Sequence, residues 1–99
     1  MRTLIVEDEA KADLIEAHDW YERRERGLGA RFESHLHDAF TWIDENVGLC
    51  PEFLPGVRRH NMKVFPYSVF FTMTDTELRV VAVLHGARHP RIVRKRMDQ

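Results

Sequence analysis

The chain has 99 residues, of which 43% are hydrophobic and 31% charged, and its formal net charge is -1. A chain of this length usually builds one core, and the sequence has no run of about 18 uninterrupted apolar residues that would span a membrane. Charge is unevenly distributed, because residues 1–50 carry 6 Lys/Arg against 12 Asp/Glu while residues 51–99 carry 9 against 4. The basic half therefore predicts an anionic partner, either a nucleic acid or an acidic protein segment.

A short strand and two amphipathic helices are predicted in the acidic half. Residues 3–6 are rich in β-branched side chains, which suit a strand, and Asp8 offers a cap for a helix that begins there. Apolar residues recur in this helix at Ala10, Leu14, Ala17 and Tyr21. After the chain reversal at Gly27 and Gly29, a second apolar stripe contains Leu28, Phe32, Leu36, Ala39, Phe40, Ile43 and Val47. Gly48 and Pro51 end this helix, so the two segments form a helical hairpin.

The basic half is predicted to form strands. Pro51, Pro55 and Gly56 indicate a loop, after which residues 57–64, 68–74 and 78–85 have the composition of strands. A tight turn at residues 75–76 joins the last two, and the nearly continuous apolar run at 78–84 is typical of a central strand covered on both faces. The predicted fold is α+β in the order βααβββ, with the helical hairpin packed on one side of a curved, mainly antiparallel sheet.

Several motifs along the chain resemble a known family. They are Ala12-Asp13-Leu14, Asp19-Trp20-Tyr21, Gly27-Leu28-Gly29-Ala30-Arg31-Phe32, Arg58-Arg59, Phe65-Pro66-Tyr67, Val81-Ala82-Val83-Leu84-His85, Arg88, Pro90 and Arg96. In this order they resemble the RelE/ParE superfamily, the toxins of type II toxin–antitoxin modules that include the plasmid stabilisation proteins. The resemblance covers almost the whole chain as one toxin domain over residues 1–99, and it is closer to the ParE-like branch.

The resemblance implies a toxin that a cognate antitoxin neutralises by wrapping around it, in a heteromeric complex or with the toxin as a homodimer. Proteins similar to ParE poison DNA gyrase by protein contact, whereas proteins similar to RelE enter the ribosome and cleave messenger RNA. A third interpretation is a module that has lost toxicity and keeps only antitoxin binding. Because the active branches share one scaffold, the choice between them depends on the site.

Candidates for a ribonuclease site lie in the basic half. Cleavage by 2′-hydroxyl attack needs a proton acceptor, a proton donor and a cation for the developing charge, and the fitting residues are Arg58, Arg59, His60, Lys63, His85, Arg88 and His89. Two parts of the ribonuclease branch are missing, because Ser68 stands where that branch tends to carry arginine and Ile92 and Val93 stand at its catalytic tail positions. These departures favour a ParE-like protein that acts by binding and has no enzymatic centre.

Cations are also the candidates for contact with a target or an antitoxin, namely Arg58, Arg59, Lys63, Arg88, Arg91 and Arg96. We expect the late strands and the tail to present them on a cation-rich concave surface, which the helices support from behind. Arg58 and Arg59 are neighbours on a strand, so at most one of them can face that surface. The tail cations Arg91, Arg94, Lys95 and Arg96 are predicted to form either a solvated cationic end or a docking place for an acidic antitoxin segment.

No metal, cofactor or membrane association is predicted, and we expect the protein to be cytoplasmic. His35 and His37 are two positions apart on a helix, so their side chains point about 200° apart and cannot converge on one ion. Cys50 has no second thiol to pair with. The sequence contains no Gly-rich phosphate loop, nucleophile elbow or dinucleotide fingerprint, and the apolar run at residues 4–6 is too short for a secretory signal.

Overall fold

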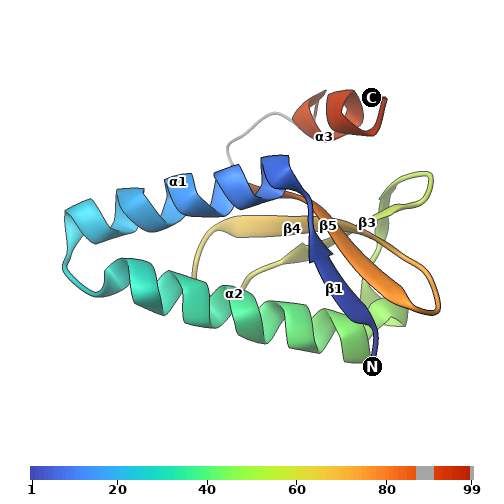
Figure 1. The fold of residues 1–99 in the computed structure, drawn as a ribbon, viewed down its shortest axis with the longest axis horizontal. Coiled ribbons are helices and arrows are strands. Elements are labelled where there is room, and N and C mark those ends of the chain that lie inside the picture. Colours follow the sequence, from blue (N-terminus) through green and yellow to red (C-terminus); the bar gives the residue numbers. More distant parts are fainter. Residues whose placement is uncertain (87–90, 99) are drawn as a thin grey trace.

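The computed structural model describes residues 1–86 and 91–98 of the chain. Its elements are β1 (Thr3–Val6), α1 (Asp8–Arg24), α2 (Leu28–Glu45), the short 3-10 helix η1 (Val47–Leu49), β2 (Glu52–Leu54), β3 (Val57–Asn61), β4 (Tyr67–Met73), β5 (Glu77–His85) and α3 (Arg91–Met97). The strands form one sheet in the order β1-β5-β4-β3-β2, in which β1 runs parallel to β5 and the other neighbours are antiparallel (Figure 1). The predicted α+β fold with a helical hairpin on a mainly antiparallel sheet is confirmed.

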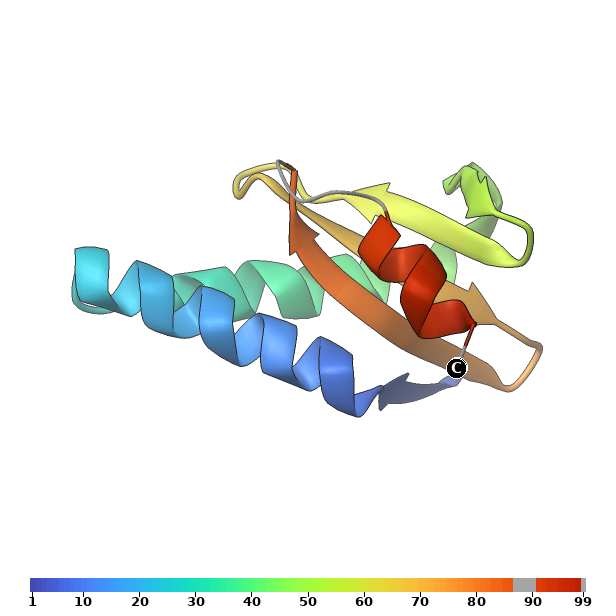
Figure 2. The same ribbon diagram turned by 90° about the horizontal axis from the view of Figure 1, so that it is seen from above.

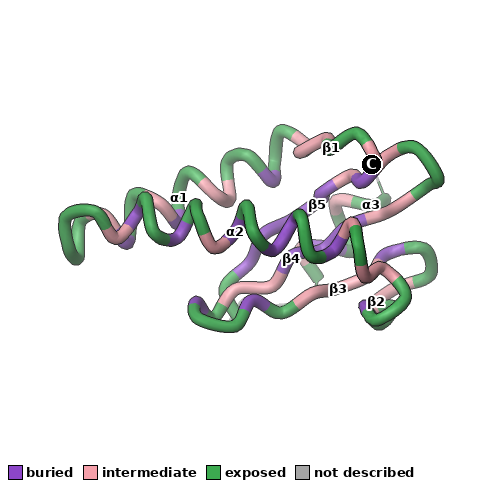
Figure 3. The backbone as a smooth tube through the Cα atoms, turned by 90° about the horizontal axis from the view of Figure 1, so that it is seen from below, coloured by how far each residue is buried: buried purple, intermediate pink, exposed green. Residues whose placement is uncertain are grey.

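The helices α1 and α2 cover one face of the sheet through an aromatic cluster. Tyr21 of α1 and Phe32 of α2 stack with ring centroids 5.5 Å apart, and Phe65 and Tyr67 contact both rings from the sheet side. Each such pair contributes about 0.5–1.5 kcal/mol beyond the burial of its area. The buried positions follow the inward sides of both helices and the middle of β4 and β5 (Figure 3).

The turn between α1 and α2 depends on two glycines and one carboxylate. Gly27 has a φ of 88°, which is favourable for glycine alone. The Glu22 carboxylate accepts hydrogen bonds from the Gly27 and Gly29 N–H groups at 2.9 and 3.0 Å, so it satisfies donors at the start of α2 that have no partner within the helix. These bonds lower the pKa of Glu22. A Cβ at Gly29 would lie 2.8 Å from the His18 carbonyl oxygen, so the two helices cross where no side chain fits.

The central strand β5 contains a β-bulge. Phe70 pairs with Ala82 whereas Phe71 pairs with Val80, which leaves Val81 as the extra residue. Side chains alternate between the two faces of a strand, and the bulge shifts this alternation by one residue. Leu78 and Val80 before the bulge and Val83 after it therefore all belong to the core under the helices. All residues from Val80 to Leu84 are buried, which confirms the prediction of a central strand covered on both faces.

The helix α3 covers part of the opposite side of the sheet, which we call the open face. Val93 of α3 is fully buried against a second apolar cluster made of Val57, Phe70, Val81, Ala82 and Leu84. Figure 2 shows α3 crossing over β5 on this face. None of the described helices is long and apolar enough to cross a bilayer.

The predicted order βααβββ is incomplete in two places. The loop expected at Pro51, Pro55 and Gly56 contains the strand β2, which pairs with β3 through Glu52–Arg58 and Leu54–Val57. The tail expected to be solvated forms α3. The strand β2 has three residues between two prolines, and the helix α3 has seven residues. Both were missed because segments this short do not show a periodic pattern of apolar residues.

Candidate functional site

Arg58 and Arg59 lie on opposite faces of β3, as their neighbouring positions predict. Arg58 faces the helix side, where its guanidinium donates to the carbonyl oxygens of Cys50 at 2.7 Å and Val47 at 3.4 Å. It therefore ties the chain after α2 to the sheet. Arg59 faces the open side, with its guanidinium carbon 5.6 Å from the centroid of the Phe53 ring. Of the two, Arg59 is the one placed for contact with another molecule.

His60 and Lys63 line a pocket of about 200 Å³ between α2 and β3. The His60 ring stacks on the Trp42 indole with centroids 4.8 Å apart and planes at 26°. Burial, together with the nearby positive charge of Lys63, lowers the pKa of His60. His60 is consequently held neutral near pH 7 in a stack with an aromatic ring, an arrangement suited to packing an apolar group from a partner.

His85 lies in a different pocket, beside α1. The His85 ring meets the Tyr67 ring edge-on at a centroid distance of 5.3 Å. The pocket of about 320 Å³ around them is completed by Glu16, Trp20 and Arg23. His60 and His85 therefore do not share a pocket.

Arg96 is engaged inside the molecule. Its guanidinium makes a two-pronged ion pair with Asp13, with N–O distances of 2.6 and 2.9 Å, and also donates to the Val81 carbonyl at 3.1 Å. Asp13 in turn accepts the Val83 N–H at 3.0 Å. Because β1 pairs with β5 only as far as Val80, these side chains satisfy the backbone of β5 where its strand partner ends. Hydrogen bonding to Asp13 raises the pKa of Arg96.

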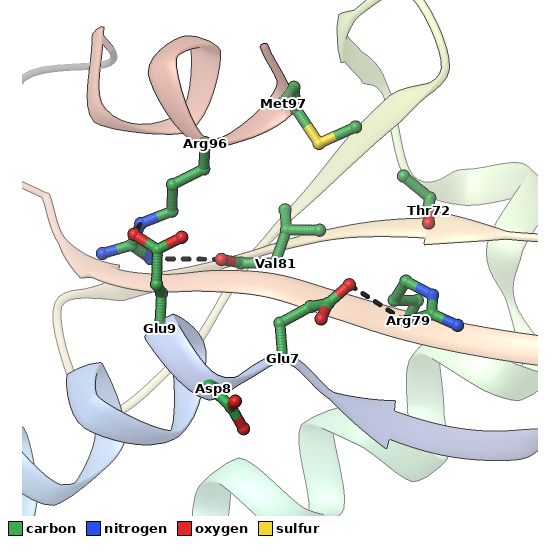
Figure 4. A pocket seen from close by; sticks show the side chains of 8 residues that line it. All are labelled: Glu7, Asp8, Glu9, Thr72, Arg79, Val81, Arg96 and Met97. Carbon is green, nitrogen blue, oxygen red and sulfur yellow. Dashed lines mark hydrogen bonds and ion pairs between the residues drawn. The ribbon is translucent and has the colours of Figure 1, made fainter. Parts of the chain in front are cut away.

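A pocket of about 420 Å³ adjoins this ion pair on the open face, at the start of α1 (Figure 4). Arg79 lies in it, paired with Glu7 at 3.0 Å and with Glu77 at 3.1 Å, and Arg96 also approaches Glu9 at 3.4 Å. The cations of this pocket are thus neutralised by the chain itself. The sequence named Asp13 only as part of a family resemblance and Arg96 as a candidate for binding a partner. It gave neither their pairing nor a role for Arg79, because no local pattern links residues 72 or 83 positions apart.

The expected single concave surface of cations is not what the structure shows. Arg58 and Lys63 lie on the helix side, so the expectation is wrong for them, whereas Arg59 lies on the open face. The tail prediction is wrong for Arg96, whose side chain is largely buried, and right for Arg91, Arg94 and Lys95, which are exposed. Arg88 and His89 lie outside the described residues.

The prediction that two helix histidines diverge is confirmed. His35 lines the pocket with His60, whereas His37 lines another pocket with Leu4 and Phe40. Over residues 1–86 and 91–98, no group of three or more His, Cys, Asp or Glu side chains is placed to hold a metal ion. Burial raises the pKa of the Cys50 thiol, so this cysteine has the properties of a packed core residue.

Comparison with known proteins identifies the family. Residues 4–90 match the family model described as the ParE toxin of the type II toxin–antitoxin system, parDE. The chain belongs to the ParE toxin family. Its fold is similar to a chain from a solved structure described as the chromosomal ParDE TA system from P. aeruginosa, with a TM-score of 0.74 and 19% sequence identity over 86% of this chain and 96% of that one. No curated protein sequence matches the chain.

The ParE family match includes most of the features described above. Residues 4–90 contain the helical hairpin, the sheet except for Thr3 of β1, and the carboxylate of Asp13. The helix α3, which supplies Arg96, lies beyond the match. The likeness to the ParDE structure supports the shared α+β scaffold, and the contacts of α3 are described for this chain alone.

Proposed function

We propose that this ParE-family chain is a toxin that inhibits DNA gyrase by binding it, and that a cognate antitoxin neutralises it in a heteromeric complex. The observation that carries the proposal is the match to the ParE toxin family over residues 4–90. The solved relative is described as a ParDE toxin–antitoxin system, which supports an antitoxin as the partner.

The positions of the titratable side chains support binding rather than RNA cleavage. A ribonuclease needs a base, an acid and a cation around one phosphate. Among the described residues, His60 lies between α2 and β3 with Lys63 in the same pocket, but His85 lies beside α1 and Arg59 lies on the opposite face of the sheet, so His60, His85 and Arg59 do not converge. A single phosphate cannot contact these three side chains at once, whereas a protein target needs no such convergence.

The test is a gyrase supercoiling assay with purified protein. We expect micromolar toxin to inhibit supercoiling of relaxed plasmid, and the antitoxin encoded beside it to restore activity. In a parallel translation mixture, messenger RNA should remain intact. Codon-positioned cleavage with unaffected gyrase would instead identify a RelE-like ribonuclease, and antitoxin binding without either effect would identify a module that has lost toxicity.

A further inference from the structure

The pocket that contains His60 has the size and the lining of a binding site for a small molecule. It has a volume of about 200 Å³ and lies on the helix side of the sheet, between α2 and the end of β3. We call it the α2–β3 pocket. One wall comes from residues that recur on one face of α2, and the other wall comes from β3 and the loop after it. The lining residues are His35, Asp38, Ala39, Trp42, His60, Met62 and Lys63.

The inner part of the α2–β3 pocket is aromatic and apolar. Ala39 and Met62 are buried. The Trp42 indole stacks on the His60 ring with centroids 4.8 Å apart, and 38% of the Trp42 surface stays exposed. The His60 ring thus holds the indole in place while part of the indole remains open to a ligand.

Charge at the rim of the pocket is balanced. Asp38 and Lys63 are exposed and have opposite signs. Burial and the charge of Lys63 lower the pKa of His60, so this ring is neutral near pH 7. Within residues 1–86 and 91–98, neither Asp38 nor Lys63 forms an ion pair. The rim therefore attracts no ion of either sign, and the Asp38 carboxylate is placed to accept a hydrogen bond from a neutral ligand.

The volume of the pocket limits the ligand to a small ring system. Sites for drug-sized molecules enclose about 300–1,000 Å³, whereas an apolar cavity of about 150 Å³ holds one benzene molecule. A volume of about 200 Å³ lies between these values and suits two fused rings. Stacked aromatic rings attract one another beyond the burial of their area, so the exposed indole favours a planar aromatic ligand over an aliphatic one.

We propose that the α2–β3 pocket binds a small, neutral, planar aromatic molecule with one N–H donor, the chemical class that indole represents. The rings of the ligand extend the stack of Trp42 and His60 and cover Met62, and its N–H group donates to Asp38. Binding of this ligand is a property of the toxin alone. It goes beyond the gyrase function proposed above and does not depend on it.

Heteronuclear NMR of the nitrogen-labelled full chain tests this binding, with indole as the probe. The side chains of Trp20 and Trp42 give two N–H signals, which Trp20→Phe and Trp42→Phe assign. Trp20 keeps 43% of its surface exposed in a different pocket, so it is an internal control for nonspecific contact. We expect the Trp42 signal to shift saturably, with a dissociation constant of about 0.1–1 mM, and the Trp20 signal to stay in place.

Two related molecules separate the contribution of the rings from that of the N–H group. Benzofuran has the shape of indole with an oxygen in place of the N–H group, and it should bind about fivefold more weakly. Cyclohexanol is neither planar nor aromatic and should not shift the Trp42 signal measurably.

Three variants locate the binding energy. Asp38→Ala, at an exposed position, should weaken indole about fivefold and leave benzofuran unchanged, because only indole donates to the carboxylate. Trp42→Ala should weaken both ligands at least about tenfold, as followed by the backbone N–H signal of Lys63. The matched variant Trp20→Ala should leave both affinities within about twofold. Circular dichroism and thermal unfolding establish that each variant is folded.

Three results would overturn the proposal. They are equal shifts of the Trp20 and Trp42 signals, binding of cyclohexanol as tight as that of indole, and the absence of a saturable shift up to the solubility limit of indole. Equal losses of indole and benzofuran binding in Asp38→Ala would show that the carboxylate does not recognise the N–H group. The gyrase assay contains no indole, so its outcome and that of the NMR titration are read separately.

Discussion

At the scale of single residues, the ion pair between Asp13 and Arg96 best explains how the chain closes its sheet. The pair joins α1 to α3 across the edge of β5, and the two side chains keep only 9% and 13% of their surface exposed. A sequence pattern cannot reveal this pair, because its members are 83 positions apart and neither stands in a local motif that marks it for pairing. The family resemblance marked both positions without giving their role.

Replacing Asp13 should therefore destabilise the protein strongly. Asp13→Ala leaves the Arg96 guanidinium and the Val83 N–H without their main partner, and should lower the free energy of unfolding by about 3 kcal/mol. Glu7→Ala removes an exposed ion pair with Arg79 and should cost less than about 1 kcal/mol. Urea unfolding of the two variants measures both values, and equal losses would show that the inner pair has no special role.

The ionisation of two histidines provides a second test at this scale. Burial lowers the pKa of His60, whereas the hydrogen bond to Asp19 raises the pKa of His18. Ring resonances followed by NMR during a pH titration should place the His60 midpoint below about 6.5 and the His18 midpoint above it. Because the folded state favours neutral His60, its contribution to stability is present above about pH 6.5 and is lost as the pH falls through the folded pKa. The reverse order of midpoints would contradict the stack with Trp42.

At the scale of elements, long periodic segments could be predicted from the sequence and short ones could not. The hairpin of α1 and α2 was predicted because its apolar stripes extend over several turns. The strand β2 and the helix α3 exist through their tertiary contacts, namely pairing with β3 and burial of Val93. The contact of Arg59 with the Phe53 ring depends on β2, so the sequence could name this residue as a candidate without giving its surroundings.

The close approach of α1 and α2 at Gly29 can be tested by adding one methyl group. Alanine normally favours a helix over glycine, yet a Cβ here would meet both the side chain and the carbonyl oxygen of His18. Gly29→Ala should therefore lower stability by about 1–3 kcal/mol. The matched variant Gly48→Ala places its methyl group where no atom lies within 4 Å and should change stability by less than about 1 kcal/mol. A gain in melting temperature for Gly29→Ala would refute the predicted crossing.

The contribution of α3 to the open face gives another prediction at this scale. Val93→Ala should lower the free energy of unfolding by about 2 kcal/mol, because the side chain is fully buried under the sheet. Ile92→Ala, at a half-buried position of the same helix, should cost less than about 1 kcal/mol. Denaturant unfolding checks the difference, and a negligible effect of Val93→Ala would mean that α3 does not pack in solution as described.

At the scale of the whole molecule, the separation of charge along the sequence has two consequences. Some of the separated charges neutralise one another within the molecule. Acidic residues at the start of the chain form ion pairs with cations of its second half, namely Glu7 with Arg79 and Asp13 with Arg96. Other cations of the second half lie at the surface, where Arg59 is half-buried and Lys63, Arg91, Arg94 and Lys95 are exposed. The excess of cations in residues 51–99 predicted an anionic partner, but the topology of the sheet decides which of those cations remain for one.

The central claim, that this ParE-family toxin acts on gyrase, is tested most directly by plasmid topology in cells. Expression should be induced from a tightly regulated promoter, with and without the antitoxin, while topoisomers and messenger RNA are sampled together. We predict that plasmids lose negative supercoiling before growth stops, that messenger RNA remains intact, and that the antitoxin prevents both the change in topology and the growth arrest. Unchanged topoisomers in arrested cells whose messenger RNA is cut would contradict the account.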